Sequence, residues 1–329
     1  MIGAEFEFRT QAAEALFEAG FQRASRLDLQ LPDQQYVDAP DGTQTPYVVF
    51  GDVQAAERIH LTSVPYSTTL DDDSQLIRGK AQHIALGSDT ALVVAQQYDP
   101  FDQRFSKKQR GEIAHGSFLP FAERLAVVAR DIGISDDQEL DLSGFSEAAD
   151  VEVEAVWQAF NNENFVFPEV KRMGVFEPAR DLARGILVGF AFATSGKQLF
   201  TNVMDSHSPA LIDARDIDVS DLAQAEKQHA KAATDRVISW WKADALGNFA
   251  LMRGFGTDRT VKQLASLSLR PGVPQMLVVR MEDSSVFPEK AFNLLEQNGN
   301  LTSQTQTGDH SVFDNVARAA AGALQTAAL

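Results

Sequence analysis

The sequence LDLSGFSEAA at positions 140–149 decides how the rest of the chain is interpreted. Apolar and polar residues alternate up to Gly144, which is typical of a short β-strand. A stretch without glycine or proline then runs from Glu147 to Phe160, which predicts a helix. A strand, a tight turn centred on a serine and a helix together match a nucleophile elbow. Small residues flank the serine there, because larger side chains would collide with the strand and the helix.

Ser146 would lie at the start of the predicted helix. The backbone N–H groups and the dipole at a helix N-terminus stabilise negative charge that develops nearby. A single G-x-S-x-A pattern is weak evidence by itself, because a strand-to-helix turn in which the serine only caps the helix has the same pattern. The rest of the sequence therefore has to distinguish a nucleophile from a capping residue.

Composition narrows the class of partner. The chain has 329 residues, a formal net charge of −17 and no cysteine. The negative charge argues against nucleic acid or an anionic membrane as a partner, and the lack of cysteine excludes disulfides and thiol nucleophiles. The first residues lack the features of a signal peptide, and the longest apolar run, residues 185–193, is too short to cross a bilayer. We expect a cytoplasmic protein that acts on a small molecule, without a membrane span; a homo-oligomer is compatible with these features.

Strand-like and helix-like segments alternate along the first half of the chain. Strands are predicted at 25–31, 45–50, 58–64, 90–96, 140–145 and 170–176, and helices at 10–24, 74–85, 118–132 and 147–160. The basic residues Arg104, Lys107, Lys108 and Arg110 are interpreted as part of a solvated loop. This alternation predicts an α/β fold, a mostly parallel sheet with helices on both faces. Ligands bind beyond the carboxyl ends of the strands in such sheets.

Residues 179–260 interrupt the alternation and are interpreted as a helical insertion. Strands at 275–280 and 300–305 and helices at 260–267, 289–297 and 312–328 then resume it. We therefore expect a core formed by 1–178 and 261–329, with 179–260 as a helical cap. The role of residues 1–24 stays open.

A serine hydroxyl needs a base to take its proton, and the base needs a carboxylate to hold its tautomer. Asp283 and His310 each follow a predicted strand, so we expect them at the same sheet edge as Ser146. The order serine, acid, histidine is the one associated with nucleophile elbows on open α/β sheets. Glu282, one residue earlier in the same turn, is the alternative acid.

Neither a metal nor a cofactor is predicted. No histidine pair has metal-ligand spacing with carboxylates, and no glycine-rich phosphate loop is present. The remaining histidines, interpreted as surface or satisfied core residues, are His60, His83, His115, His207 and His229.

Three stretches together resemble the α/β-hydrolase family. They are the elbow at 144–148, the acid turn at 278–288 and the histidine turn at 308–313. The resemblance covers nearly the whole chain and implies the family's fold, with a cap between the sixth and seventh core strands. It also implies a catalytic triad of Ser146, Asp283 and His310.

The resemblance implies an oxyanion hole as well. One donor would be the backbone N–H of Glu147, directly after the serine. Where the family commonly has His-Gly after the third strand, this chain has Val-Pro-Tyr-Ser at 64–67, and Pro65 has no N–H, so the second donor is Tyr66 or Ser67. Ala148 stands where the family usually has glycine. A Glu147 side chain pointing inward would oppose an oxyanion.

The implied activity is hydrolysis of an ester or related acyl bond of a small, apolar substrate through an acyl-enzyme. Two alternatives stay open: a hydrolase-like protein without catalysis that serves binding or assembly, and the same triad acting on amide or carbon–carbon bonds. Large apolar residues of the cap are either its own core or the lining of an acyl pocket: Phe190, Phe192, Phe200, Trp240, Trp241, Phe249 and Met252.

Overall fold

Eight strands form one sheet in the order β1-β2-β4-β3-β5-β6-β7-β8. The computed structural model describes residues 32–64, 70, 73–98, 105–135, 137–178, 239, 243–282, 284, 287, 289–295 and 300–306. The strands are β1 Gln35–Asp38, β2 Gln44–Phe50, β3 Arg58–Ser63, β4 Thr90–Ala95, β5 Glu139–Phe145, β6 Val170–Phe176, β7 Gln275–Met281 and β8 Leu301–Gln306. The β1–β2 and β2–β4 pairs are antiparallel and the other pairs are parallel. The predicted α/β class with a mostly parallel sheet is confirmed.

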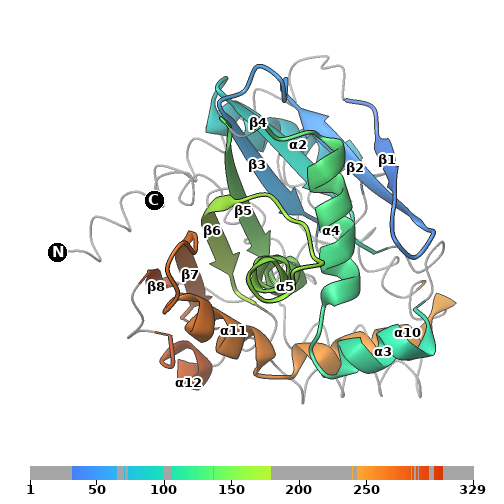
Figure 1. Ribbon diagram of the computed structural model, residues 1–329, viewed down its shortest axis with the longest axis vertical. Helices are drawn as coiled ribbons and strands as arrows, with labels where there is room; N and C mark the ends of the chain where they lie inside the picture. The colour runs from blue at the N-terminus through green and yellow to red at the C-terminus, as the bar shows by residue number, and fades with distance from the viewer. Residues whose placement is uncertain are drawn as a thin grey trace, which may run out of the picture.

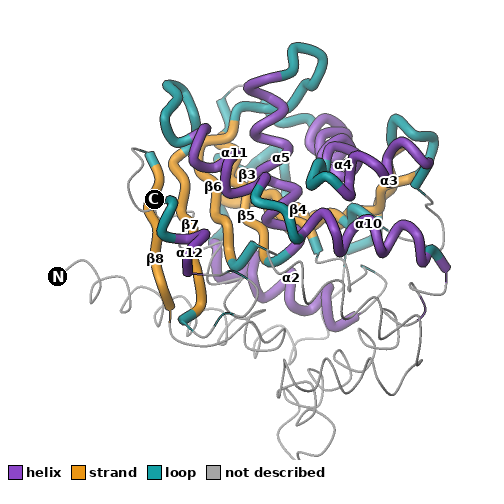
Figure 2. Tube along the Cα trace, turned by 90° about the horizontal axis from the view of Figure 1, so that it is seen from below, coloured by secondary structure: helices purple, strands orange, loops and turns teal. Residues whose placement is uncertain are grey.

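Helices cover both faces of this sheet (Figures 1 and 2). They are α2 Asp73–Leu86, α3 Lys107–Ala114, α4 Leu119–Asp131, α5 Glu147–Asn161, α10 Ala245–Phe255, α11 Arg259–Leu267 and α12 Glu289–Phe292. Helices α4, α5 and α11 lie on one face and α2 lies on the other. None of the described helices is long and apolar enough to cross a membrane.

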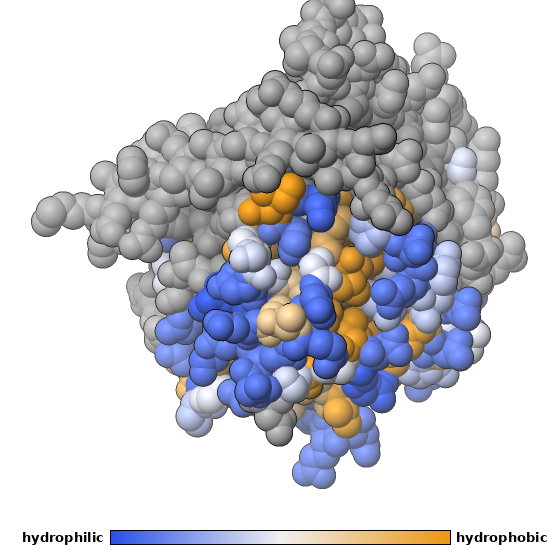
Figure 3. Space-filling model, turned by 90° about the horizontal axis from the view of Figure 1, so that it is seen from above, coloured by the Kyte–Doolittle hydropathy of each residue, from blue (hydrophilic) through white to orange (hydrophobic). Residues whose placement is uncertain are grey.

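The main core lies between the sheet and helices α4, α5 and α11. Residues paired across parallel strands share a face, and the register aligns Leu61, Leu142, Met173 and Met276 in one row across four strands. All four are at most 1% exposed. Figure 3 shows one outer face of the molecule, which is mostly hydrophilic with a narrow apolar band. Burial of apolar rows of this kind is the main favourable contribution to folding.

Two elements differ from the sequence-based prediction. The strand before the turn at 38–42 is Gln35–Asp38, an exposed edge strand, whereas the predicted strand 25–31 lies outside the described residues. The basic segment predicted as a loop instead contains α3, which begins with a capping box between Ser106 and Gln109.

Helix α3 depends on a distant partner. It lies beside α10 at the carboxyl edge of the sheet (Figure 1). The two helices approach so closely that a Cβ added at Gly254 would lie 2.1 Å from the carbonyl oxygen of Ile113. Tertiary packing of this kind overrides a weak local propensity, because most helix stability in proteins comes from the packed face.

Candidate active site

Ser146 occupies a strained turn between β5 and α5. Its backbone has φ 56° and ψ −125°, a conformation that non-glycine residues adopt rarely. Its N–H donates to the carbonyl oxygen of Phe176 on β6 at 2.9 Å. A Cβ added at Gly144 would lie 2.5 Å from the backbone nitrogen of Ala149. The expected steric need for a small residue before the serine is therefore confirmed, and Ala148 on the other side is 1% exposed.

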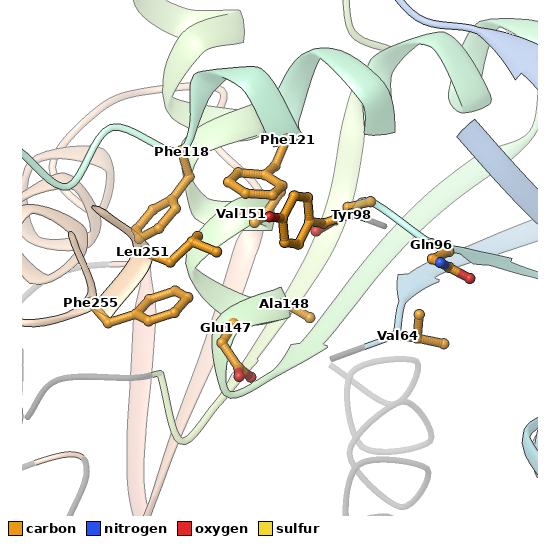
Figure 4. A pocket seen from close by; sticks show the side chains of 11 residues that line it. Val64, Gln96, Tyr98, Phe118, Phe121, Glu147, Ala148, Val151, Leu251 and Phe255 are labelled. Atoms are coloured by element: carbon orange, nitrogen blue, oxygen red, sulfur yellow. The ribbon is translucent and has the colours of Figure 1, made fainter. Parts of the chain in front are cut away.

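Glu147 is the first residue of α5. Helix geometry leaves the first N–H groups without an acceptor inside the helix, so they point past its end. The Glu147 side chain is half-buried, and Figure 4 shows its carboxylate turned away from the rings of Phe118 and Phe121. The backbone of Glu147 thus lies at the helix start, while its carboxylate points away from the aromatic rings that line the cavity.

The other acidic residues of α5 contact neighbouring elements. Asp150 accepts a hydrogen bond from Thr260 Oγ1 at 2.5 Å, and Glu154 accepts one from Gln263 Nε2 at 2.9 Å. Both partners belong to α11. Glu152 is fully buried and faces Ser63 at the end of β3, and burial raises its pKa well above the usual value. The carboxylates of Asp150 and Glu154 are therefore part of the packing of α5 against α11.

An apolar cavity of about 20 Å³ adjoins the elbow (Figure 4). It lies among the ends of β3 and β4, the start of α4, helix α5 and helix α10. Its lining residues are Val64, Gln96, Gln97, Tyr98, Phe118, Phe121, Glu147, Ala148, Val151, Leu251 and Phe255. This volume holds about one water molecule.

Stacked rings form the wall of the cavity. Tyr98 stacks on Phe105 with ring centroids 4.7 Å apart, and Phe118 stacks on Phe255 at 5.1 Å. The buried Arg124 holds the segment after β4 by donating to the carbonyl oxygen of Gln97 at 2.7 Å. The wall of the cavity is therefore formed by the segment after β4, by the start of α4 and by helix α10.

The cap residues proposed from the sequence contribute little to the described wall. Phe249 is 38% exposed on the outside of α10. Phe190, Phe192, Phe200, Trp240, Trp241 and the side chain of Met252 lie outside the described residues.

The fold resembles those of several solved enzymes. An enol-lactonase from Burkholderia xenovorans LB400 matches with a TM-score of 0.55 at 14% identity, covering 89% of this chain and 98% of that one. A thioesterase domain from the curacin biosynthetic pathway matches at 0.52 and 13%, covering 90% and 100%. The carboxylesterase CesB from Bacillus subtilis matches at 0.51 and 14%, covering 91% and 92%.

The chain has the α/β-hydrolase fold. No protein-family model matches the sequence, and no curated protein sequence matches it. The likeness therefore lies in the fold. In this chain, Ser146 lies at the turn between β5 and α5.

Four predicted site residues of this α/β-hydrolase fold lie outside the described residues: Tyr66, Ser67, Asp283 and His310. The strands that lead to the last two are described. Strands β7 and β8 are parallel neighbours, and the N–H of Glu282 donates to the carbonyl oxygen of Gln306 at 2.6 Å. Both turns therefore leave the sheet at the same edge as Ser146, while the convergence of the triad stays a prediction. Glu282, the alternative acid, is exposed.

Sequence reasoning missed Glu177. It directly follows β6, is fully buried and has φ 47°. Its carboxylate accepts hydrogen bonds from the N–H of Met281 and from Ser284 Oγ, the latter at 2.5 Å. In the sequence, Glu177 directly follows the predicted strand 170–176. A carboxylate placed directly after a buried strand was the available signal, and it is the same signal that selected Asp283.

Proposed function

We propose that the protein is a serine hydrolase that cleaves an ester or related acyl bond of a small, apolar substrate. The observation that carries this proposal is the strained conformation of Ser146, at φ 56°, on a strand–turn–helix of an α/β-hydrolase fold. Strain of this kind is stored at functional sites and is offset by the surrounding structure. The similar structures include a lactonase, a thioesterase and a carboxylesterase, which agrees with acyl chemistry.

In the proposed mechanism, His310 accepts the proton of Ser146 Oγ as the oxygen attacks the substrate carbonyl. A carboxylate, predicted from the sequence as Asp283, orients His310 and stabilises its cation. The backbone N–H groups of Glu147 and of Tyr66 or Ser67 bind the oxyanion, and losing one such donor typically costs about 2.7–4 kcal/mol. Water activated by His310 then hydrolyses the acyl-enzyme.

The cavity supports a short acyl group. Its volume is about 20 Å³, and its lining is mostly aliphatic and aromatic. Ring packing of the kind seen between Phe118 and Phe255 resists expansion, because close-packed interiors have few voids. The carboxylate of Glu147 at its edge disfavours an anionic acyl group.

The first test is covalent labelling with a fluorophosphonate probe, followed by hydrolysis of p-nitrophenyl acetate and p-nitrophenyl octanoate. The parent should be labelled and should prefer the acetate. Ser146→Ala should abolish labelling, and Ser146→Ala and His310→Ala should each lower kcat by about 10⁴-fold or more, because triad members act as a unit. Ser135→Ala, on the exposed loop before β5, is the matched control and should behave as the parent.

Other outcomes select the alternatives. A parent that is neither labelled nor active on the esters would be a binding or assembly protein. Labelling at Ser146 with turnover of an amide or a diketone, but not of the esters, would indicate amide or carbon–carbon bond hydrolysis.

A further inference from the structure

The cavity beside the elbow has an amide side chain in its wall. Gln97 follows β4 and lines the cavity. Along β4, Val93 and Ala95 belong to the main core, whereas Val94 packs on the opposite face of the sheet. Side chains alternate between the two faces of an extended chain, so Gln97 lies on the same face as Ala95. The sheet therefore directs this amide toward the helices that surround the elbow.

The backbone around Gln97 is held by three hydrogen bonds. The N–H of Gln96 donates to the carbonyl oxygen of Pro46 at 2.9 Å, and Gln96 Oε1 accepts the N–H of Leu70 at 2.9 Å. Arg124 Nη1 donates to the carbonyl oxygen of Gln97 itself at 2.7 Å. The Gln97 side chain thus extends from a fixed backbone, and such preorganisation lowers the entropic cost of binding.

The amide nitrogen of Gln97 is buried without an acceptor. The residue is 5% exposed, and nothing in the part of the chain that the structure describes accepts a hydrogen bond from Nε2. A buried donor without a partner is unfavourable, and native structures retain few such groups. The wall of the cavity therefore contains an N–H donor that a bound molecule can satisfy.

Most of the remaining wall is apolar. Figure 4 shows the aliphatic and aromatic side chains that line it: Val64, Ala148, Val151, Leu251, Phe118, Phe121 and Phe255. A water molecule buried in a protein typically has two to four polar partners. An ether or keto oxygen accepts without donating, so the N–H of Gln97 alone can satisfy it while the attached carbons contact the apolar wall. The cavity therefore suits an apolar chain with one acceptor oxygen better than it suits water.

From this arrangement we propose that Gln97 Nε2 determines acyl specificity by binding an acceptor oxygen within an otherwise apolar acyl group. The inference rests on the proposed serine hydrolase function, because it assigns the cavity to the acyl group of the substrate. It narrows the substrate class to esters of short acids that carry an ether or keto oxygen. Gln97 binds the substrate in this proposal and takes no part in bond cleavage.

A buried water shared with Thr45 is the structural alternative. The antiparallel register that pairs Tyr47 with Ala95 places Thr45 opposite Gln97. Thr45 is fully buried, and its Oγ1 also has no hydrogen-bond partner among the described residues. A water between the two side chains would satisfy both of them without any ligand. Thr45 does not line the cavity, so the two accounts predict different effects of replacing it.

The test compares p-nitrophenyl 3-methoxypropanoate with p-nitrophenyl pentanoate, whose acyl groups have equal numbers of non-hydrogen atoms. A second pair, the methoxyacetate and the butanoate, places the oxygen nearer the carbonyl. Each kcat/KM is divided by the rate constant for hydroxide hydrolysis, which corrects for the intrinsic reactivity of the ester. The parent should prefer the methoxy ester of at least one pair by about 10-fold or more, because the alkyl ester leaves the buried donor unpaired.

Three variants of the full-length protein assign this preference. Gln97→Leu should reduce it to about twofold or less, while hydrolysis of the alkyl ester stays within about threefold of the parent. Gln97→Glu replaces the donor with an acceptor and should reverse the preference. Thr45→Val, the matched control, removes a neighbouring unpaired polar group outside the cavity and should keep the parental preference.

Several results would overturn the proposal. A parent that hydrolyses both members of each pair equally contradicts it, as does parental preference in Gln97→Leu. If Gln97→Leu does not fold, Gln97→Glu decides, and a retained preference for the methoxy ester counts against the proposal. If Thr45→Val loses as much preference as Gln97→Leu, the two residues share a water.

Binding to Ser146→Ala separates this failure from that of the proposed function. Ligand-observed NMR measures the affinities of methyl 3-methoxypropanoate and methyl pentanoate for Ser146→Ala, with and without Gln97→Leu. If the parent hydrolyses no ester but Ser146→Ala binds the methoxy ester more tightly, and only when Gln97 is present, the proposed function fails and the role of Gln97 stands. Equal affinities for the two esters would refute the role of Gln97.

Discussion

At the scale of single residues, the site depends on backbone conformation as much as on reactive groups. Ser146 is held at φ 56° because its N–H donates to Phe176 and the next residue starts a helix. Gly144 makes this possible, since the backbone of α5 passes directly over its Cα. The strained turn that carries Ser146 therefore requires a residue without a side chain at position 144.

Gly144→Ala should destabilise the protein and disturb the elbow together. The added methyl group would lie 2.5 Å from the nitrogen of Ala149 and 2.6 Å from the carbonyl carbon of Ala148, and neither backbone atom can move without shifting α5. We expect a loss of about 1–3 kcal/mol, as for overpacking in a core, with slower fluorophosphonate labelling. Thermal unfolding and the labelling rate measure the two effects.

The control is Gly111→Ala on α3, where an added Cβ meets nothing within 4 Å. Alanine should stabilise this helix by up to about 1 kcal/mol through propensity alone. Equal melting temperatures for Gly144→Ala and the parent would contradict the steric account of the elbow.

At the scale of elements, α5 buries acidic residues on two sides. Asp150 and Glu154 receive donors from α11, which joins the two helices over the core. Glu152 faces Ser63 on β3 instead, and burial raises its pKa by more than the interaction with Ser63 lowers it. One helix thus carries two fully buried glutamates with opposite energetic consequences.

Glu152→Gln should stabilise the protein at neutral pH. Burial raises the pKa of Glu152 well above its usual value of 4.5, so above pH 4.5 the folded state binds more protons than the unfolded state, and stability falls as pH rises. Each unit of that shift is worth about 1.4 kcal/mol, so the variant should gain at least about 1 kcal/mol at pH 7.5. Urea unfolding at pH 7.5 and pH 4.5 should show the gain shrinking at the lower pH.

Glu154→Gln is the matched control on the same helix. Glu154 accepts hydrogen bonds from Gln263 at 2.9 Å and from Arg259 at 3.1 Å, so replacing it should destabilise the protein, by about 1–3 kcal/mol. A stabilising Glu154→Gln, or a Glu152→Gln that destabilises at pH 7.5, would sink this account of α5.

At the scale of the whole molecule, the two faces of the sheet differ in chemistry. The face under α4, α5 and α11 is an apolar row, whereas the centre of the opposite face holds a buried polar group. His60 Nε2 lies 2.7 Å from Ser143 Oγ, and Asp141 accepts a hydrogen bond from Arg172 Nε at 2.7 Å and lies 3.6 Å from Arg58. His60 and Asp141 are paired across β3 and β5 and fully buried. His60 and Ser143 lie within the sheet, so they contribute to stability rather than to substrate binding.

The buried histidine should make the protein sensitive to acid. Burial first, and the charges of Arg58 and Arg172 next, lower the pKa of His60 from 6.5 to about 3. Between these values the unfolded state binds more protons than the folded state, so stability falls as pH drops below 6.5. His60→Gln removes this titration. From pH 7 to pH 5 the parent should lose about 2 kcal/mol more than the variant.

Urea unfolding of the two proteins at both pH values measures this difference. His83→Gln replaces a half-buried histidine whose pKa is also lowered, first by burial and then by the charge of Lys80, and it should reduce the acid sensitivity less. Parallel pH profiles for the parent and His60→Gln would contradict the assignment.

The amino-acid sequence was enough to predict the α/β class, most strand and helix positions and the turn that carries Ser146. Strands β3, β4, β6 and β7 were predicted within one residue at each end, because a buried strand is a local run of apolar residues bounded by turn residues. The elbow was visible for the same reason: Gly144, Ser146 and Ala148 lie within five residues.

The surroundings of Ser146, by contrast, depend on contacts between distant parts of the chain. Helix α3 packs against α10, which lies about 140 residues later in the chain. The cavity combines side chains from five separate elements. The direction of the Glu177 carboxylate depends on the register of β6 against β7, whose residues are about 100 positions apart. Periodicity is a property of neighbours in the chain, whereas which carboxylate reaches which strand end depends on pairing between distant segments, and this pairing exists only once the sheet has formed.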